Sequence, residues 1–353
     1  MELRNENKIM LFPRISKAII IIVAIAFVIT GIRGYQLFRY VFDINVKTPG
    51  SIIIPGEAGF DQVLDSLKKH DVLFNYKAFK WVSKRKQYRD SIKPGKYLLT
   101  TGMTTNQIVN MLRSGNQQPV VVTFNNIRNF NQLAAAVAKY IEPDSLALLQ
   151  KFNDTIVCST YGFTRQTFAG MFIPNSYEFY WTTTPDQFVD RMATEYKRFW
   201  NDNRKEKAAA HNLTPVQVAT LASIVQEETA KNEEKPVVAG LYLNRLKKGM
   251  LLQADPTIKF AVGDFSIRRV LHEHLLVESP YNTYKHAGLP PGPISFPEIS
   301  SIEAVLNAEK HNYLYMCAKE DFSGYHNFAT TLSGHNQNAW KYQAALNQHK
   351  IWK

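Results

Sequence analysis

Cysteine is almost absent from this chain of 353 residues, which contains only Cys158 and Cys317. Two cysteines so far apart exclude a disulfide framework and a cysteine-ligated metal cluster, and we expect two unpaired, buried thiols. The sequence also lacks a phosphate-binding glycine-rich loop, an HExxH zinc motif and a GxSxG nucleophile elbow. We therefore predict neither a cofactor nor a metal.

Acidic side chains are in the minority, with 30 Asp and Glu against 42 Lys and Arg, and the net charge is +12. The most basic segment contains Lys77, Lys80, Lys84, Arg85, Lys86, Arg89, Lys93 and Lys96, interleaved with Phe79, Trp81 and Tyr88. In a cytoplasmic protein such a segment can bind nucleic acid. Outside a membrane it can bind lipid head groups or wall polymers, or it is simply a solvated helix face.

The long apolar run at residues 18–32 decides between these compartments, and it is bounded by Lys17 and Arg33. A spanning helix needs about 20 residues, which residues 34–38 supply while Arg33 snorkels. Because no small-residue cleavage site follows, we predict an uncleaved anchor at 18–38 rather than a signal peptide. The basic tail, residues 1–17, then stays cytoplasmic. The remaining chain lies outside the cytoplasmic membrane, and nucleic acid is not expected as a partner.

The rest of the chain predicts an α+β protein with two folded parts. After a stalk at 39–50, residues 51–118 predict a small module with strands at 51–54 and 96–100. Its segments 55–67 and 100–112 align without gaps as two turn-then-helix units. Residues 119–353 predict a larger mixed α+β domain. Its expected elements are a strand at 120–124, helical stretches at 130–151 and 185–212, two helices within 214–248, a loop-rich region at 249–300, a strand at 312–318 and a helix at 336–349.

One predicted helix carries two adjacent carboxylates. Thr214 as N-cap, Pro215 at the first position and Gln217 at the third form a good helix start. At 100° per residue, Glu228 falls within the apolar arc and Glu227 on the opposite face, toward water. An acid among apolar groups has a raised pKa, which suits a general acid, although such a glutamate is also often a structural ion-pair partner.

Two downstream segments contain polar and aromatic side chains of the kind that bind sugars. Residues 251–261 contain Gln253 and Asp255, and the Pro/Gly-rich residues 279–297 contain Asn282 and Tyr284. Amides, hydroxyls and aromatic rings on loops suit a carbohydrate groove. The alternative is a loop stiffened by prolines that only covers a core.

The segments ASIVQEET, LYLNRLKKGMLLQADPT and SPYNTYKHAGLPPGPIS, in this order and spacing, resemble the endolytic murein transglycosylases, or YceG-like family. The resemblance covers essentially the whole chain and implies a membrane anchor, a LysM-like module at 51–118 and a catalytic domain at 119–353. Members of the family often have a Glu-x-Glu pair whose second glutamate is the catalytic acid. This chain has Gln226 and Glu228 there, so the first glutamate is dispensable.

The resemblance implies that Glu228 protonates the oxygen between N-acetylmuramic acid (MurNAc) and N-acetylglucosamine (GlcNAc). It then accepts the proton of the muramyl C6 hydroxyl, which closes a 1,6-anhydro ring. Asp255 would stabilise positive charge or bind a sugar, or else cap a helix before Pro256. Gln253, Asn282 and Tyr284 are the expected substrate contacts. Asn282 and Tyr284 belong to the same motif, SPYNTYKHAGLPPGPIS.

The implied partners are peptidoglycan glycan strands, the membrane and cell-wall synthesis enzymes, and the implied role is to terminate glycan elongation. His326 and His335 are expected to be structural. Two alternatives remain open. One is a peptidoglycan hydrolase with Asp255 as the second carboxylate, and the other is a non-catalytic wall-binding scaffold.

Overall fold

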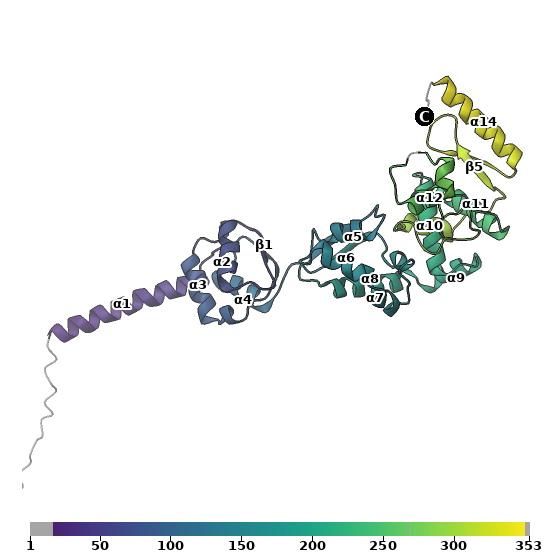
Figure 1. Ribbon diagram of the computed structural model, residues 1–353. Coiled ribbons are helices and arrows are strands. Elements are labelled where there is room, and N and C mark those ends of the chain that lie inside the picture. Colours follow the sequence, from purple (N-terminus) through teal and green to yellow (C-terminus); the bar gives the residue numbers. More distant parts are fainter. Residues whose placement is uncertain (1–16, 268, 350–353) are drawn as a thin grey trace, which may run out of the picture. The chain divides into compact units, whose positions relative to one another are not determined.

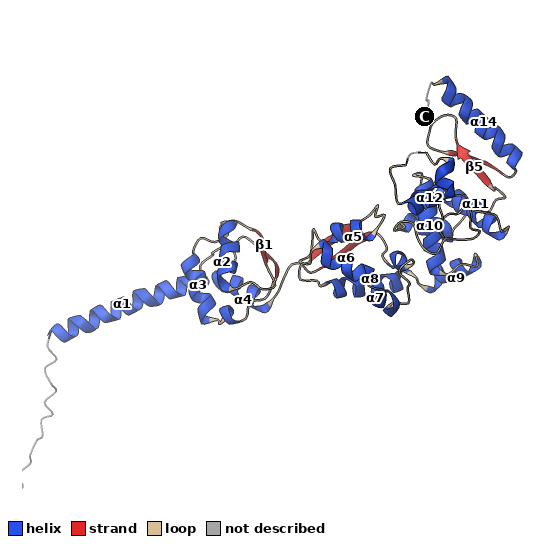
Figure 2. Ribbon diagram, viewed as in Figure 1, coloured by secondary structure: helices blue, strands red, loops and turns tan. Residues whose placement is uncertain are grey.

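The structure, a computed structural model, describes residues 17–267 and 269–349. The chain divides into two compact units, Met1–Gln118 and Pro119–Lys353, and each has its own hydrophobic core (Figure 1). Within the described residues helices predominate, and the strands form three separate two-stranded antiparallel sheets. Figure 2 shows the helices in blue and the strands in red. The predicted cytoplasmic tail, apart from Lys17, lies outside the described residues.

The first helix, α1 (Lys17–Phe42), is longer than the anchor predicted at residues 18–38. It is 26 residues long, so it measures about 39 Å at 1.5 Å per residue, and none of its residues is buried. The mean hydropathy of its most apolar 18-residue window is 2.3. By length and composition, α1 is able to cross a membrane.

The predicted strand–turn–helix repeat is present in the first unit. Its elements are β1 (Gly50–Ile54), α2 (Phe60–Lys69), α3 (Tyr76–Arg85), the short 3₁₀ helix η1 (Tyr88–Asp90), β2 (Gly95–Leu99) and α4 (Thr105–Ser114). The strands β1 and β2 pair antiparallel, with Gly50 opposite Leu99 and Ile54 opposite Gly95. A turn and a helix follow each strand, because apolar residues on α2 and α4 cover the same core.

Residues 39–50 do not form the separate stalk that the sequence predicts. The helix α1 continues through Phe42, and Asn45 and Val46 are buried in the first unit. The Asn45 side chain accepts a hydrogen bond from the Asn75 backbone N–H (2.6 Å) and donates one to the Asn75 carbonyl (3.1 Å). These contacts join the end of α1 to the folded unit without a free linker.

The aromatic residues of the basic segment belong to the core of the first unit. Phe79 and Tyr88 are fully buried, and Trp81 packs against the same core. The Arg85 guanidinium lies 5.4 Å from the centre of the Trp81 ring. Since these rings are engaged in packing, they do not offer the stacking surface that single-stranded nucleic acid uses.

The second unit begins with a small sheet covered by helices. Its first elements are β3 (Val120–Phe124), α5 (Phe130–Val137), α6 (Ser145–Asn153), α7 (Thr155–Thr160), the 3₁₀ helix η2 (Phe168–Met171), β4 (Asn175–Phe179) and α8 (Pro185–Phe199). The strands β3 and β4 pair antiparallel. The core here is aromatic: the Phe130 ring contacts those of Phe152, Phe172 and Phe296. The helix η2 and the strand β4 both lie within residues 168–181.

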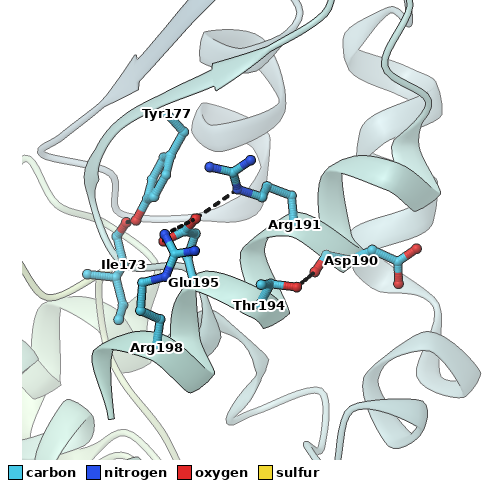
Figure 3. A network of polar contacts seen from close by, with 7 residues as sticks. All are labelled: Ile173, Tyr177, Asp190, Arg191, Thr194, Glu195 and Arg198. Atoms are coloured by element: carbon cyan, nitrogen blue, oxygen red, sulfur yellow. Dashed lines mark hydrogen bonds and ion pairs between the residues drawn. The ribbon is translucent and has the colours of Figure 1, made fainter. Parts of the chain in front are cut away.

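Figure 3 shows two sets of polar contacts, one within α8 and one at the entry of β4. The Glu195 carboxylate accepts hydrogen bonds from Arg191 (2.8 Å) and Arg198 (3.2 Å) on the same helix. The Tyr177 hydroxyl donates to the Ile173 carbonyl at 2.6 Å. Ion pairs with exposed partners contribute about 0–1 kcal/mol each, so these contacts orient the side chains more than they stabilise the fold.

The remaining part of the second unit surrounds one buried helix. Its elements are α9 (Asp202–Ala210), α10 (Pro215–Glu228), α11 (Lys235–Lys247), α12 (Asp255–Val262), the 3₁₀ helix η3 (His272–Leu276), α13 (Ile299–Leu306), β5 (Tyr315–Ala318), β6 (His326–Ala329) and α14 (Leu332–Gln348). The helix α10 contacts α9, α11, α12 and α13, and α14 packs on the β5–β6 hairpin. The sequence predicted neither α12, which lies in the expected loop region, nor β6.

Candidate active site

The helix α10 begins as the sequence predicts. The Thr214 hydroxyl accepts a hydrogen bond from the Gln217 backbone N–H (3.3 Å), and the Gln217 side chain accepts one from the Thr214 N–H (2.8 Å). Pro215 occupies the first helical position. Every residue from Val218 to Val225 is buried, so this stretch has no solvent-facing side. The Glu228 end of α10 reaches a cavity.

The cavity at the end of α10 has a volume of about 230 Å³. Five parts of the second unit form it: the end of α10, one face of α11, residues 252–255, Tyr284 and the β5–β6 hairpin. It is lined by Glu228, Leu241, Tyr242, Arg245, Leu252, Gln253, Asp255, Tyr284, Met316, Cys317, Ala318 and His326. Three of the four predicted substrate contacts thus lie around the predicted acid.

The Glu228 carboxyl group is set up to titrate near neutral pH. Its Oε1 accepts a 2.6 Å hydrogen bond from the Tyr242 hydroxyl. Burial raises the pKa of Glu228 from 4.5 to about 7, although the Tyr242 hydrogen bond opposes this rise; the neighbouring charge of Asp255 raises the pKa further. A large fraction is therefore protonated at neutral pH, as a general acid requires.

The neighbouring Glu227 does not line the cavity, as its place on the helix predicts, but it does not face open water. Its carboxylate lies 3.6 Å from the Arg128 guanidinium, and its side chain is 25% exposed. Arg128 belongs to the segment between β3 and α5, which covers this side of α10. Helix periodicity cannot predict this contact, because the two residues are far apart in the sequence.

Gln226 explains why a glutamate is not required at this position. Its Oε1 accepts hydrogen bonds from the Glu298 backbone N–H (2.7 Å) and the Ser301 hydroxyl (3.2 Å), at the start of α13. Its amide nitrogen donates to the Phe296 carbonyl at 3.4 Å. An amide satisfies both kinds of partner, whereas an ionised carboxylate only accepts. Gln226 is therefore a structural connection between α10 and α13.

Asp255 and Tyr284 form a hydrogen-bonded pair on the cavity wall. The Tyr284 hydroxyl donates to Asp255 Oδ1 at 2.5 Å. Burial and the Asp255 carboxylate raise the pKa of Tyr284, which keeps its hydroxyl protonated. The N-cap of α12 is Ala254, and no side chain caps this helix. The alternative role of Asp255 as a cap is therefore wrong.

Gln253 lines the cavity in an unusual backbone conformation. Its φ is +49°, in the left-handed region, which residues other than glycine adopt rarely. Its N–H donates to the Thr283 carbonyl (3.1 Å), and its Oε1 accepts from Arg245 (3.2 Å). These bonds hold the strained residue with its side chain at the cavity.

Asn282 lies behind the cavity wall and not on its surface. It is fully buried, and its amide nitrogen donates to the carbonyls of Leu275 and Val277, both at 2.9 Å. Its Oδ1 accepts a 3.0 Å hydrogen bond from the Tyr284 backbone N–H. In the structure Asn282 is a positioning residue for the loop that presents Tyr284, and we assign it no direct substrate contact.

Tyr242 and Arg245 are site residues that sequence reasoning missed. They lie three positions apart on α11, so they share one face of the helix, and both line the cavity. Arg245 is buried and donates to the carbonyls of Leu314 (2.6 Å), Leu251 (3.0 Å) and Leu252 (2.9 Å). It thereby joins the segment before α12 to the segment before β5. The sequence did contain a signal for them: Tyr242 and Arg245 lie three positions apart within the motif at 241–257.

A larger cavity, of about 1270 Å³, lies on the opposite face of α11, beside Gly240 and Asn244. It does not include Glu228 or any of the predicted substrate contacts. Size alone would favour it, but the side chains whose pKa values are raised by burial, Glu228, Tyr242 and Tyr284, are at the smaller cavity. We therefore place the candidate active site at Glu228.

Comparisons with known sequences and structures find similar proteins over most of this chain. A sequence profile of the YceG-like family matches residues 52–341. The endolytic murein transglycosylase of Bacillus subtilis (strain 168) is 32% identical over 325 residues, covering 86% of this chain and 87% of the relative. That of Streptococcus pneumoniae (strain ATCC BAA-255 / R6) is 27% identical over 342 residues, and the match covers 86% of this chain but only 61% of the longer relative.

A solved structure shows the same fold. The crystal structure of a YceG-like protein from Listeria monocytogenes has a TM-score of 0.56 and is 27% identical to this chain. The match covers 82% of this chain and 99% of the crystallised one. The likeness therefore extends over both described units and the mixed α+β architecture.

Proposed function

The chain belongs to the YceG-like family, and from that premise we propose that it is a lytic transglycosylase that cleaves MurNAc–GlcNAc bonds within peptidoglycan strands. The family identifies the enzyme class, a lyase acting on murein. The observation that carries the chemical assignment is the Glu228 carboxyl group, whose pKa is raised to about 7 at a polar cavity.

The first proposed step is protonation of the leaving group. Protonated Glu228 donates its proton to the glycosidic oxygen as the C1–O bond breaks. The Tyr242 hydroxyl holds the carboxyl group in place through Oε1 and stabilises the carboxylate that remains. Hydrogen bonds to a charged group contribute about 1.5–3 kcal/mol, and this stabilisation grows as the proton leaves.

The second proposed step is ring closure. The muramyl C6 hydroxyl attacks C1 and gives its proton to the ionised Glu228 carboxylate, which restores the acid. The attack forms a 1,6-anhydro ring, so water is not the nucleophile. Because the nucleophile belongs to the substrate, the reaction gains from intramolecular proximity. The Asp255 carboxylate stabilises the positive charge that develops near C1, and Gln253 and Tyr284 contact the sugar; all three line the cavity.

We further propose that α1 anchors the protein in the cytoplasmic membrane, with the N-terminus inside and the second unit outside. The length and apolarity of α1 support the anchor, and the positive-inside rule supports the orientation. Anchoring confines cleavage to newly made strands near the membrane, where it terminates glycan elongation beside the wall synthesis enzymes. The compact strand–helix–helix–strand unit with its own core supports the LysM-like assignment of the first unit.

Product analysis of digested peptidoglycan tests this proposal. The full chain in detergent and its Glu228→Gln variant are incubated with purified peptidoglycan, and the fragments are measured by mass spectrometry. Glu227→Gln is the matched control, because its carboxylate lies outside the cavity. We expect fragments one water lighter than hydrolytic products from the wild type and the control, and none from Glu228→Gln. An active Glu228→Gln variant would refute the assignment.

A hydrolase is the second candidate, since Glu228 and Asp255 line the same cavity and hydrolysis uses two carboxylates. It predicts full-mass reducing ends, lost in Asp255→Asn as completely as in Glu228→Gln. The anhydro product predicts that Asp255→Asn is slower but still forms anhydro ends. If neither the wild type nor any variant cleaves, the wall-binding scaffold is the better description.

A further inference from the structure

His326 is held at the cavity by a buried carboxylate. Its backbone N–H donates to Glu234 Oε1 at 2.7 Å, and its ring Nδ1 lies 2.8 Å from Glu234 Oε2. Glu234, the N-cap residue of α11, is only 5% exposed. One carboxylate therefore fixes both the backbone and the ring of His326, and this residue lines the same cavity as Glu228.

This arrangement determines which ring nitrogen is free. A carboxylate only accepts hydrogen bonds, so the network assigns the hydrogen to Nδ1. The neutral ring then has its lone pair on Nε2. No hydrogen bond to Nε2 is formed by residues 17–267 or 269–349, and the side chain is 17% exposed. A second cavity group with an open acceptor atom, fixed through its other nitrogen, matches the way a general base is oriented by a carboxylate.

We propose that His326 is a second catalytic residue, whose Nε2 takes the proton from the muramyl C6 hydroxyl during ring closure. This rests on the proposed lytic reaction and gives the second proton transfer to His326 in place of Glu228. The bond from O6 to C1 forms, the bond from C1 to the glycosidic oxygen breaks, and Glu228 protonates that oxygen. His326 becomes an imidazolium, and its proton passes to solvent while Glu228 regains one.

The surrounding charges suit this role. The Glu234 carboxylate stabilises the imidazolium without moving, since it already contacts Nδ1. Arg245, a cation that lines the cavity, has its guanidinium bound to backbone carbonyls and is not available as a base. The remaining titratable groups of the cavity are Glu228, Tyr242, Asp255, Tyr284 and Cys317; Asp255 and Tyr284 are bound to each other.

The decisive variant is His326→Asn. The asparagine amide nitrogen can occupy the place of Nδ1 and keep the hydrogen bond to Glu234, whereas nothing replaces Nε2. His335→Asn on α14 is the matched control, because His335 does not line the cavity. In the full chain in detergent, we expect His326→Asn to lower kcat about 10²- to 10⁴-fold, the usual contribution of a general base, with KM little changed. The control keeps the wild-type kcat.

Chemical rescue separates a base from a structural residue. In His326→Ala, added imidazole can enter the space left by the ring, and we expect it to restore part of kcat with anhydro products; His326→Asn, whose side chain fills that space, gains less. A wild-type kcat in His326→Asn would overturn the proposal. So would a folded but inactive His326→Ala that imidazole does not rescue. Failure of the proposed function looks different: the wild type itself would then yield no anhydro ends.

Discussion

Replacing Glu228 with glutamine should abolish activity and yet stabilise the folded protein. The gain in stability should appear only at alkaline pH. The pKa of Glu228 is raised from 4.5 to about 7 in the folded state, so the folded protein binds this proton more tightly than the unfolded chain. The stability that the proton confers is fully present below pH 4.5 and is lost as the pH rises through 7. At 1.36 kcal/mol per pKa unit, ionised Glu228 lowers the free energy of unfolding by about 3 kcal/mol.

Glutamine is neutral at every pH and can still accept the Tyr242 hydrogen bond. At pH 8 the Glu228→Gln variant should therefore be about 3 kcal/mol more stable than the wild type. For a unit of this size, that corresponds to a rise in Tm of about 6–12 °C. At pH 4.5 or below the two proteins should unfold at nearly the same temperature. Differential scanning calorimetry of the full chain in detergent, at both pH values, measures the difference.

Glu227→Gln is the control, because it removes a negative charge from the same helix. Its carboxylate pairs with the partly exposed Arg128, so its loss should lower stability by about 0–1 kcal/mol. A Glu228→Gln variant with no gain at pH 8 would refute the reasoning. A gain of the same size at both pH values would also refute it, because it would come from packing and not from the proton.

Three further predictions concern single contacts within the second unit. Tyr242→Phe removes a hydrogen bond that lowers the pKa of Glu228, so the alkaline limb of the kcat/KM profile should move upward by about one pH unit; an unchanged limb would contradict the assignment of Glu228 as the acid. Gln226→Glu leaves the Phe296 carbonyl without its donor and should lower the free energy of unfolding by about 1–3 kcal/mol, measured by denaturant titration. Gly292→Ala would place a Cβ 2.0 Å from the backbone carbonyl oxygen of Gln166 and should lower the free energy of unfolding by about 1–3 kcal/mol or more. A Tm equal to that of the wild type would show that the segments around Gly292 and Gln166 move apart easily.

Local sequence patterns predicted the elements whose cause is local. The start of α10 follows from Thr214, Pro215 and Gln217, which interact only with one another. The strand–turn–helix repeat of the first unit could be recognised because the apolar residues of α2 and of α4 recur at the same helical spacing after each turn. The stalk was predicted wrongly, because the contact between Asn45 and Asn75 joins residues 30 positions apart.

Within the site, the sequence alone pointed to the candidate acid: the helical period predicted Glu228 on the apolar side of its helix and Glu227 away from it, and the resemblance to the family's motif implied the catalytic role of Glu228. Only the tertiary structure decided what surrounds that acid. Tyr242, Asp255 and His326 meet Glu228 because the ends of distant segments converge on one cavity, and no periodicity encodes that convergence. The same folding partly buries Glu228 and holds His326 against Glu234. The proton affinity of a side chain depends on its solvent and neighbours in space, which the order of residues along the chain does not display.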